Sequence, residues 1–189
     1  MIKIAFDLDG VVIDTFSLLR QLFIDHWSHD INPHKRFEFT VPGRTEEEVS
    51  NLWYNNLEDI TYNSLPLNNS ILYLTQIYNN KLPLVFITAR NKKKLTDCTE
   101  AWLAKYLGDI PFKVFYIKDK YKVKVLKALK IQYFVDDRFR TVNQVAPHIK
   151  KAYLFNHSWN LGRRAKHPNI ERITSLGKIV DDLYTLKGE

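Results

Sequence analysis

The arrangement of short apolar runs along the chain is the feature that most constrains its fold. Each run is rich in β-branched or aromatic residues and is bounded by polar residues, a pattern typical of buried parallel strands. The runs are Ile2–Phe6, Leu84–Ile87, Val114–Ile117, Tyr133–Val135 and Ala152–Phe155. Segments with apolar residues at helical spacing, such as Leu95, Cys98 and Trp102, lie between them. This alternation predicts an α/β fold in which helices flank a parallel sheet of about five strands.

The interval between the first and second runs is about 75 residues long, which is too long for a single crossover helix. It carries helical signals of its own at residues 16–27, 45–57 and 70–78. In the middle segment, Thr45 and Glu48 have the spacing of a capping box. We therefore expect a small helical cap inserted after the first strand of a Rossmann-like sheet. The predicted division assigns residues 1–14 and 81–189 to the core and residues 15–80 to the cap.

Composition and charge restrict the class of protein. The net charge of +7 and the pI of about 9.3 favour anionic partners, either phosphorylated small molecules or nucleic acid. The same excess is typical of proteins with many surface lysines. No segment reaches the roughly 18 consecutive apolar residues of a membrane span. The apolar run directly after Met1 leaves no room for a secretory leader, and Cys98 is the single cysteine. These features predict a cytoplasmic protein without a membrane segment.

Two acidic residues, Asp7 and Asp9, follow the first apolar run, and Gly10 comes directly after them. Ligands of an open α/β sheet bind at the carboxyl ends of its strands. Side chains two residues apart point the same way from an extended backbone, so both carboxylates can face one phosphate and one Mg²⁺. The alternative is a surface turn, in which Asp and Gly are common. This pair alone does not decide between the two interpretations.

The second run ends in Thr88, Ala89 and Arg90. A hydroxyl at a strand end and the amides that open the next helix can bind phosphate oxygens. The alternative is that Thr88 only caps that helix.

Lysines and a second acidic pair accompany the fourth run. One lysine near the start of the preceding helix can neutralise a phosphate, although most of these lysines must belong to a solvated face. Asp136 and Asp137 end the run and can complete the oxygen-rich site that Mg²⁺ prefers, or can cap the following helix. The candidate lysines are Lys118, Lys120, Lys122 and Lys124.

Taken in order, these motifs resemble the signature of the haloacid dehalogenase superfamily of phosphatases, which is Asp-x-Asp, then Ser or Thr, then Lys, then an acidic pair. The resemblance covers residues 2 to about 140. Within the superfamily the chain most resembles the 5′-nucleotidases of the deoxyribonucleotidase type. The segments that carry this likeness are 118–120, 135–138, 154–155 and the Trp159-Asn160 pair. The chain departs from the family at Ala89, where a polar residue is common.

The resemblance implies a mechanism and a metal. Asp7 would attack the phosphorus and form an aspartyl-phosphate, and Asp9 would serve as the general acid and then the general base. Mg²⁺ would be held by Asp7, the backbone carbonyl of Asp9, and Asp136, with Asp137 acting through water. These roles would make the chain a Mg²⁺-dependent phosphohydrolase.

The resemblance also implies how the substrate is bound. Thr88, Ala89 and one lysine would bind the phosphoryl oxygens. Lys120 matches the family phrase, whereas Lys122 better matches the start of a helix, and both stay open. Further contacts with the substrate are expected from Trp53, Tyr54, Arg90 and Arg138.

Aromatic residues are frequent in the predicted cap, and a ring that stacks on a base binds any nucleotide. For Trp27 and Phe39 we expect a place in the cap's own core. Trp53 and Tyr54 are adjacent on a predicted helix, so we expect their rings to point in different directions. The aromatic residues of the cap are Trp27, Phe37, Phe39, Trp53, Tyr54 and Tyr62.

The predicted function is hydrolysis of nucleoside monophosphates, deoxy forms included. One alternative is a phosphatase that processes 3′-phosphorylated ends of nucleic acid, which the basic clusters at residues 92–94, 118–130 and 163–166 favour. Another is a degenerate, non-enzymatic binding module. The intact motif residues Asp7 and Asp9 oppose that second alternative.

Overall fold

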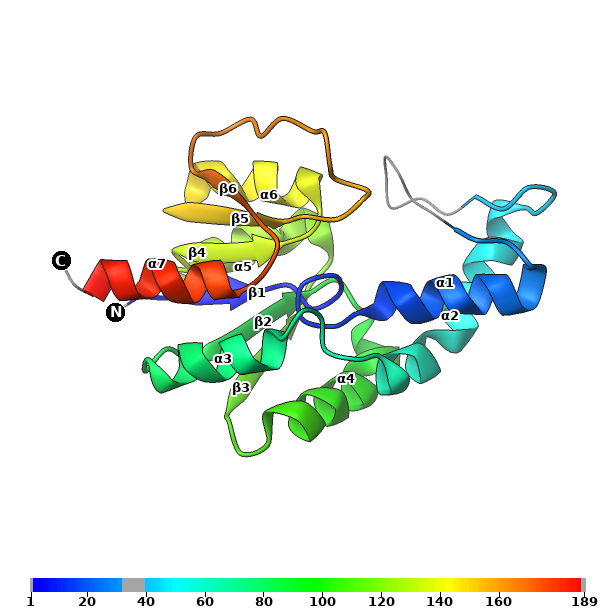
Figure 1. Cartoon of the computed structure of the whole chain (residues 1–189), viewed down its shortest axis with the longest axis horizontal. Helices are drawn as coiled ribbons and strands as arrows, with labels where there is room; N and C mark the ends of the chain where they lie inside the picture. The colour runs from blue at the N-terminus through cyan, green and yellow to red at the C-terminus, as the bar shows by residue number, and fades with distance from the viewer. Residues whose placement is uncertain (1, 32–39, 188–189) are drawn as a thin grey trace.

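The computed structural model describes residues 2–31 and 40–187. Six parallel strands form one sheet in the order β3-β2-β1-β4-β5-β6 (Figure 1). The strands are β1 (Ile4–Phe6), β2 (Leu84–Thr88), β3 (Phe112–Tyr116), β4 (Tyr133–Asp136), β5 (Lys151–Phe155) and β6 (Ile170–Ile173). The predicted parallel sheet flanked by helices is therefore confirmed.

Helices connect the strands and cover both faces of the sheet. They are α1 (Thr15–Trp27), α2 (Glu46–Asn63), α3 (Ser70–Asn79), α4 (Lys92–Leu107), α5 (Lys122–Leu129), α6 (Phe139–Val145) and α7 (Gly177–Lys187). Short 3₁₀ turns, η1 (Asp119–Tyr121) and η2 (Ala146–His148), precede α5 and follow α6. Among the described residues, no helix has the length and apolar character that a membrane span requires.

The sixth strand, β6, was not predicted. It lies at the edge of the sheet beside β5, and its two central residues, Glu171 and Arg172, are charged. An edge strand has one side open to water, so it does not need the continuous apolar run by which the other strands were recognised.

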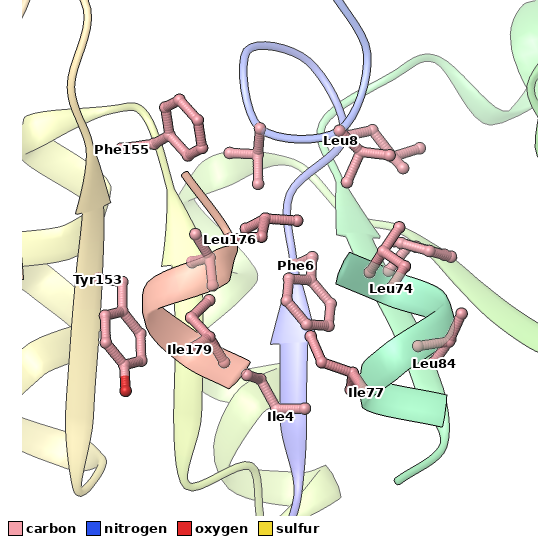
Figure 2. Packing of buried hydrophobic residues seen from close by; sticks show 14 of the residues in the cluster. Ile4, Phe6, Leu8, Leu74, Ile77, Leu84, Tyr153, Phe155, Leu176 and Ile179 are labelled. Carbon is pink, nitrogen blue, oxygen red and sulfur yellow. The ribbon is translucent and has the colours of Figure 1, made fainter. Parts of the chain in front are cut away.

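Alternating side chains of the central strand β1 contribute to two cores. Ile4 and Phe6 face the larger core and lie between Ile179 of α7 and Ile77 of α3 (Figure 2). Ala5 faces the other side of the sheet, where a second core forms beneath α5 and α6. Both faces of β1 are therefore buried, and its carboxyl end lies where ligands of an open α/β sheet bind.

The cap has a core of its own, built by α1, α2 and the segments beside them. Its fully buried members are Leu19, Phe23, Ile31, Val41, Val49 and Ile60. Trp27 packs against this cluster as expected, whereas Phe37 and Phe39 lie outside the described residues. The expected capping box at Thr45 and Glu48 is present.

The third expected cap helix, α3, packs differently from the other two. Its residues Leu74 and Ile77 belong to the large core under the sheet. We therefore propose that the cap spans residues 15–64, rather than 15–80, and that α3 belongs to the core.

Two chain segments form the neck of the cap. Ile13 and Pro66 form an antiparallel bridge, and the amide of Asp14 donates to the carbonyl of Leu65 at 2.9 Å. On the other side of the bridge the amide of Leu67 donates to the carbonyl of Val12 at 2.8 Å. The chain thus leaves and re-enters the core at one place, beside the carboxyl end of β1.

Candidate active site

The two acidic motifs follow neighbouring strands at the centre of the sheet. The register pairs Phe6 with Val135, and the amide of Asp7 donates to the carbonyl of Val135 at 2.8 Å. Asp7 and Asp136 therefore leave the same edge of the sheet side by side. The carboxyl ends of neighbouring parallel strands are the usual place for a ligand in this class of fold.

Three carboxylates converge at this edge. One oxygen each from Asp7, Asp136 and Asp137 lies within 4.8 Å of the others, and all three residues are buried. Burial raises the pKa of Asp7 to about 7, and the charges of Asp136 and Asp9 add to this against the opposing charge of Lys122. Burial raises the pKa of Asp137 well above its ordinary value, and the charges of Asp136 and Asp7 add to this effect.

The donor set of this cluster fits a hard divalent cation such as Mg²⁺. Carboxylate oxygens are the ligands that such ions prefer. Within the described part of the chain, Oδ1 of Asp7 is buried and accepts no hydrogen bond, although the ammonium of Lys122 lies 3.1 Å away. A cation would satisfy this oxygen and relieve the repulsion among the three acids.

Lys122, the first residue of α5, lies in the middle of these acids. Its Nζ is 2.8 Å from Oδ2 of Asp136, 3.1 Å from Oδ1 of Asp7 and 3.3 Å from Oδ1 of Asp119. Burial lowers the pKa of Lys122, but the charges of Asp136, Asp7 and Asp119 outweigh it and raise that pKa above its ordinary value. Lys122 is therefore a fixed positive charge within the cluster.

Lys120, the competing candidate, lies elsewhere. Its side chain is exposed, and its Nζ lies over the ring of Tyr121 at 5.0 Å from the centroid. The two lysines that the sequence left open thus have different surroundings, and only Lys122 contacts the acids.

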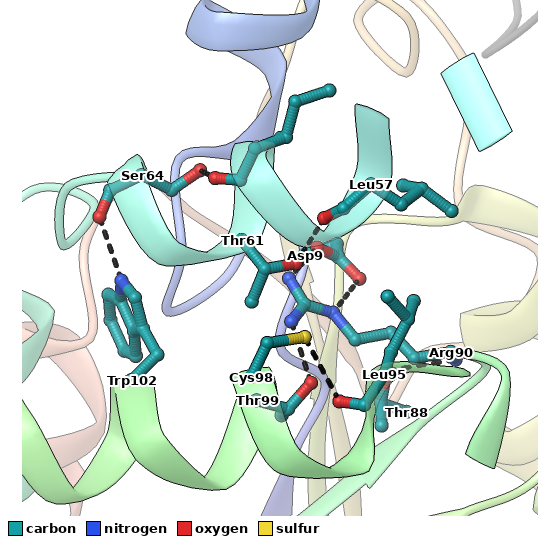
Figure 3. A network of polar contacts seen from close by, with 11 residues as sticks. Asp9, Leu57, Thr61, Ser64, Thr88, Arg90, Leu95, Cys98, Thr99 and Trp102 are labelled. Carbon is teal, nitrogen blue, oxygen red and sulfur yellow. Dashed lines mark hydrogen bonds and ion pairs between the residues drawn. The ribbon is translucent and has the colours of Figure 1, made fainter. Parts of the chain in front are cut away.

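Asp9 is paired with Arg90. The guanidinium donates to both carboxylate oxygens, at 2.9 Å from Nε and 2.6 Å from Nη2, and its Nη1 donates to the hydroxyl of Thr99 at 2.9 Å (Figure 3). Burial would raise the pKa of Asp9, but the charge and hydrogen bonds of Arg90, with a hydrogen bond from Thr15, lower it. This pairing was not foreseen, because the sequence suggested only a substrate contact for Arg90.

Thr88 and Ala89 lie beside this pair. Thr88 is the last residue of β2, is fully buried, and accepts a hydrogen bond from the amide of Arg90 through Oγ1 at 3.2 Å. Its hydroxyl hydrogen is still able to donate to a phosphate oxygen. The α4 helix begins a few residues later, with Asn91 as its N-cap.

A cavity of about 560 Å³ opens over the acids and extends under the cap. Its floor contains Asp7, Asp9, Ala89, Arg90, Asp137 and Arg138. Its apolar side comes from α1 and α2 through Phe16, Leu19, Trp53, Tyr54, Leu57 and Ile60. Lys92 and Lys118 also line it. The cavity therefore combines a charged floor with an aromatic wall.

The aromatic wall corrects one expectation. Trp53 and Tyr54 were expected to point in different directions, but their rings stack with centroids 5.5 Å apart and an interplanar angle of 26°. Both residues line the cavity, whereas Tyr62, further along α2, lines a separate cavity of about 530 Å³.

Several residues around the site were not assigned a role from the sequence. Asp119 forms ion pairs with Lys122 and with Arg138. His157 and Trp159 contact the two acidic loops from the segment after β5. The sequence pointed to one of these residues only: the Trp159-Asn160 pair was part of the family resemblance, but no role was assigned to it.

Comparisons with known proteins show similarity in fold and in overall sequence. No protein-family model matches the chain. A solved structure described as "Putative haloacid dehalogenase-like hydrolase from Bacteroides fragilis" matches with a TM-score of 0.66 and 13% identity, over 95% of this chain and 100% of that chain. The fold is thus that of the haloacid dehalogenase-like hydrolases.

Two curated proteins, both named "Putative nucleotidase", are similar in sequence. The protein from Bacillus cereus is 28% identical over 193 residues, which cover 95% of this chain and 96% of that protein. The protein from Oceanobacillus iheyensis is 23% identical over 182 residues, covering 87% and 92%. The resemblance to haloacid dehalogenase phosphatases of the nucleotidase kind is therefore confirmed.

Proposed function

We propose that the chain is a Mg²⁺-dependent phosphohydrolase that cleaves nucleoside monophosphates, deoxy forms included, and that it acts as a 5′-nucleotidase. The observation that carries the proposal is the cavity itself, which is lined by Asp7 and Asp137 and by the stacked rings of Trp53 and Tyr54. Asp136 and Lys122 are buried directly behind these acids and contact Asp7 or complete its acidic cluster. A phosphate fits beside the acids and a base beside the rings. The names of the two curated relatives support the same substrate class.

In the proposed first step a carboxylate oxygen of Asp7 forms a bond to phosphorus while the ester P–O bond breaks. The leaving oxygen takes a proton from Asp9. Lys122 and the hydroxyl of Thr88 stabilise the negative charge on the transferring group, because both are held in place before the substrate arrives. Mg²⁺ held by Asp7, Asp136 and Asp137 would supply further charge neutralisation.

In the proposed second step Asp9 takes a proton from water, and the water oxygen attacks the phosphorus and releases Asp7 and inorganic phosphate. The contact with Arg90 favours the ionised form of Asp9, which is the form that this step requires. The first step requires the protonated form, which the contact with Arg90 opposes. Either this contact loosens when the substrate binds, or the substrate binds as the monoprotonated phosphate and supplies the proton.

A phosphate-release assay on the full chain tests the proposal. The substrates are the ribo and deoxy nucleoside monophosphates, phosphorylated sugars and 3′-phosphorylated oligonucleotides, and the Asp7→Asn variant, which we expect to be inactive, is assayed beside the wild type. We expect release from the mononucleotides, loss of activity in excess EDTA, recovery with Mg²⁺, and poor recovery with Ca²⁺, whose coordination is larger and looser.

The same assay separates the alternatives. Faster release from oligonucleotide ends, with steep salt dependence, would identify an end-processing phosphatase, which the lysines that line the cavity, Lys92 and Lys118, favour. No release from any substrate would favour a binding module. Full activity in excess EDTA, or in the Asp7→Asn variant, would contradict the proposed mechanism.

A further inference from the structure

The segment that follows β5 contacts both acidic loops of the site. The indole Nε1–H of Trp159 donates to Oδ2 of Asp137 at 2.8 Å. The side-chain amide of Asn160 donates to the backbone carbonyl of Asp137 at 2.7 Å and to that of Phe155 at 2.7 Å. Both the carboxylate and the backbone of Asp137 are therefore held by neighbouring residues of one loop.

The orientation of the Trp159 ring is fixed by other aromatic rings. The ring of His157 stacks parallel to it, with centroids 4.2 Å apart and an interplanar angle of 5°. Phe16 of α1 contacts it edge-on at 5.2 Å. With only 5% of the residue exposed, the indole cannot turn its N–H away from Asp137 without repacking these neighbours.

His157 is fixed in turn by the first acidic loop. Its Nε2 lies 2.6 Å from the carbonyl oxygen of Gly10, and because a carbonyl only accepts, Nε2 carries the hydrogen. Burial lowers the pKa of His157 and so favours the neutral ring. The stack of His157 and Trp159 thus connects the loop after β1 to the acid after β4.

We propose that Trp159 is a positioning residue that holds the carboxylate of Asp137 in the arrangement that binds the divalent cation. A metal-binding carboxylate needs a partner that fixes its orientation, and loss of such a partner typically weakens metal binding about 10- to 100-fold. Trp159 supplies that partner with a buried hydrogen bond to Oδ2 of Asp137. The inference extends the proposed metal site, but its test measures binding rather than hydrolysis.

The test compares Trp159→Phe with Trp102→Phe. Phenylalanine keeps an aromatic ring and removes only the N–H donor and part of the ring area. Trp102 is a matched control because its indole is also buried and donates to a neutral acceptor, the carbonyl of Ser64, at 2.7 Å (Figure 3). Mg²⁺ binding to the full chain is measured by titration calorimetry and by the rise in melting temperature that Mg²⁺ causes.

We expect the Kd for Mg²⁺ to rise about 10- to 100-fold in Trp159→Phe and to stay unchanged in Trp102→Phe. Both variants should melt at a lower temperature than the wild type without metal, because each loses a buried hydrogen bond. An unchanged Kd in Trp159→Phe, an equal rise in both variants, or no Mg²⁺ binding by the wild type would overturn the inference.

A double-mutant cycle with Asp137→Asn tests whether Trp159 acts through Asp137. If it does, Trp159→Phe weakens Mg²⁺ binding in the wild type and adds nothing in the Asp137→Asn variant. Equal effects in both backgrounds would overturn the inference.

A measurement on the wild type covers the case in which Trp159→Phe does not fold. The chain has 4 tryptophans, so labelled indole nitrogens give a small set of signals, and single Phe variants of Trp27, Trp53 and Trp102 assign Trp159 by elimination. Mg²⁺ should shift the Trp159 signal more than that of Trp102, and equal shifts would overturn the inference. If Mg²⁺ binds as expected and no phosphate ester is hydrolysed, the proposed function fails while this inference stands.

Discussion

Gly10 allows the first acidic loop to close onto the second. Its φ is +71°, a conformation that residues with a Cβ rarely adopt, and a Cβ at this position would lie 3.0 Å from Oδ2 of Asp137. The same oxygen accepts the hydrogen bond from Trp159. The room available to the carboxylate of Asp137 is therefore limited on both sides.

The Gly10→Ala variant should bind Mg²⁺ more weakly and release phosphate more slowly, because the new methyl group displaces Asp137. Gly43→Ala is the control, since Gly43 has a similar φ of +73° and no atom of residues 2–31 or 40–187, apart from Gly43 and its two chain neighbours, lies within 4 Å of its added Cβ. Both variants should lose about 1–2 kcal/mol of stability to backbone strain. Calorimetric Mg²⁺ titration and the phosphate assay compare the two variants. Equal losses of Mg²⁺ affinity and of activity in Gly10→Ala and Gly43→Ala would contradict the expectation.

Lys122 and Lys120 provide a second comparison between single residues. Methionine keeps most of the length of either side chain and removes the ammonium group with its charge. Lys122→Met should lower kcat/KM about 10²- to 10³-fold, as loss of one fixed charge at a transition state does. Lys120→Met should change it by about twofold or less, as exposed substitutions do. Steady-state kinetics on one mononucleotide measure both variants. Mild and equal decreases in kcat/KM would mean that neither lysine stabilises the transition state.

At the scale of elements, α2 places two aromatic residues of the cap beside the cavity. Trp53 and Tyr54 stack on each other along the cavity, while Tyr62 on the same helix faces another cavity. An aromatic surface of this kind binds a nucleobase by stacking without selecting among bases.

Alanine at Trp53 or Tyr54 should therefore raise KM for nucleoside monophosphates by the equivalent of roughly 1–3 kcal/mol. KM for a small aliphatic phosphate ester, which has no base to stack, should change little. Tyr62→Ala is the matched control and should leave both values near those of the wild type. Equal increases for the nucleotide and the aliphatic ester would mean that the aromatic pair does not contact the base.

The elements that the sequence predicted well are those whose burial leaves a local signal. The central strands are continuous apolar runs, and Asp7 and Asp136 could be placed because each directly follows such a run. The α3 helix was assigned to the cap because its apolar stripe, with Leu74 and Ile77, is the same whether it packs on a sheet or on other helices. Only the tertiary contact distinguishes the two.

The parts of the site that were missed depend on contacts between distant residues. Arg90 and Asp9 are 81 positions apart, and Trp159 and Asp137 are 22 apart. The local sequence around Arg90 does not show whether its guanidinium binds a substrate phosphate or the carboxylate of Asp9, since both groups are anions. A family phrase pointed to Trp159, but the direction of its N–H follows from packing against His157 and Phe16.

At the scale of the whole molecule, one network attaches the last helix to the sheet and makes stability depend on pH. Asp182 of α7 accepts hydrogen bonds from Lys151 and Tyr153 of β5 and from Lys178. Burial alone would raise the pKa of Asp182, but these hydrogen bonds outweigh it and lower the pKa from 3.8 to about 2. A lowered pKa means that the ionised carboxylate stabilises the fold.

This stabilisation should be complete above about pH 5 and should disappear as the pH falls through about 2. The shift corresponds to roughly 2 kcal/mol at neutral pH. The wild type should thus exceed Asp182→Asn in free energy of unfolding by an amount that shrinks by about half between pH 6 and pH 3. Urea unfolding of both proteins across this range measures it, and a difference independent of pH would show that Asp182 is not the group responsible.

The bridge between Ile13 and Pro66 keeps the two ends of the cap side by side. With respect to the core, the whole cap is one long loop that starts and ends at the same place. The entropy cost of closing such a loop grows only slowly with its length, so the size of the cap adds little to the cost of folding the core. A segment whose two ends lie close together can be inserted into a domain, or replaced, without disturbing the rest of that domain. We therefore expect that a cap of another size or composition could replace this one on the same neck without moving Asp7 or Asp136. Such a replacement would change which molecule the proposed site accepts.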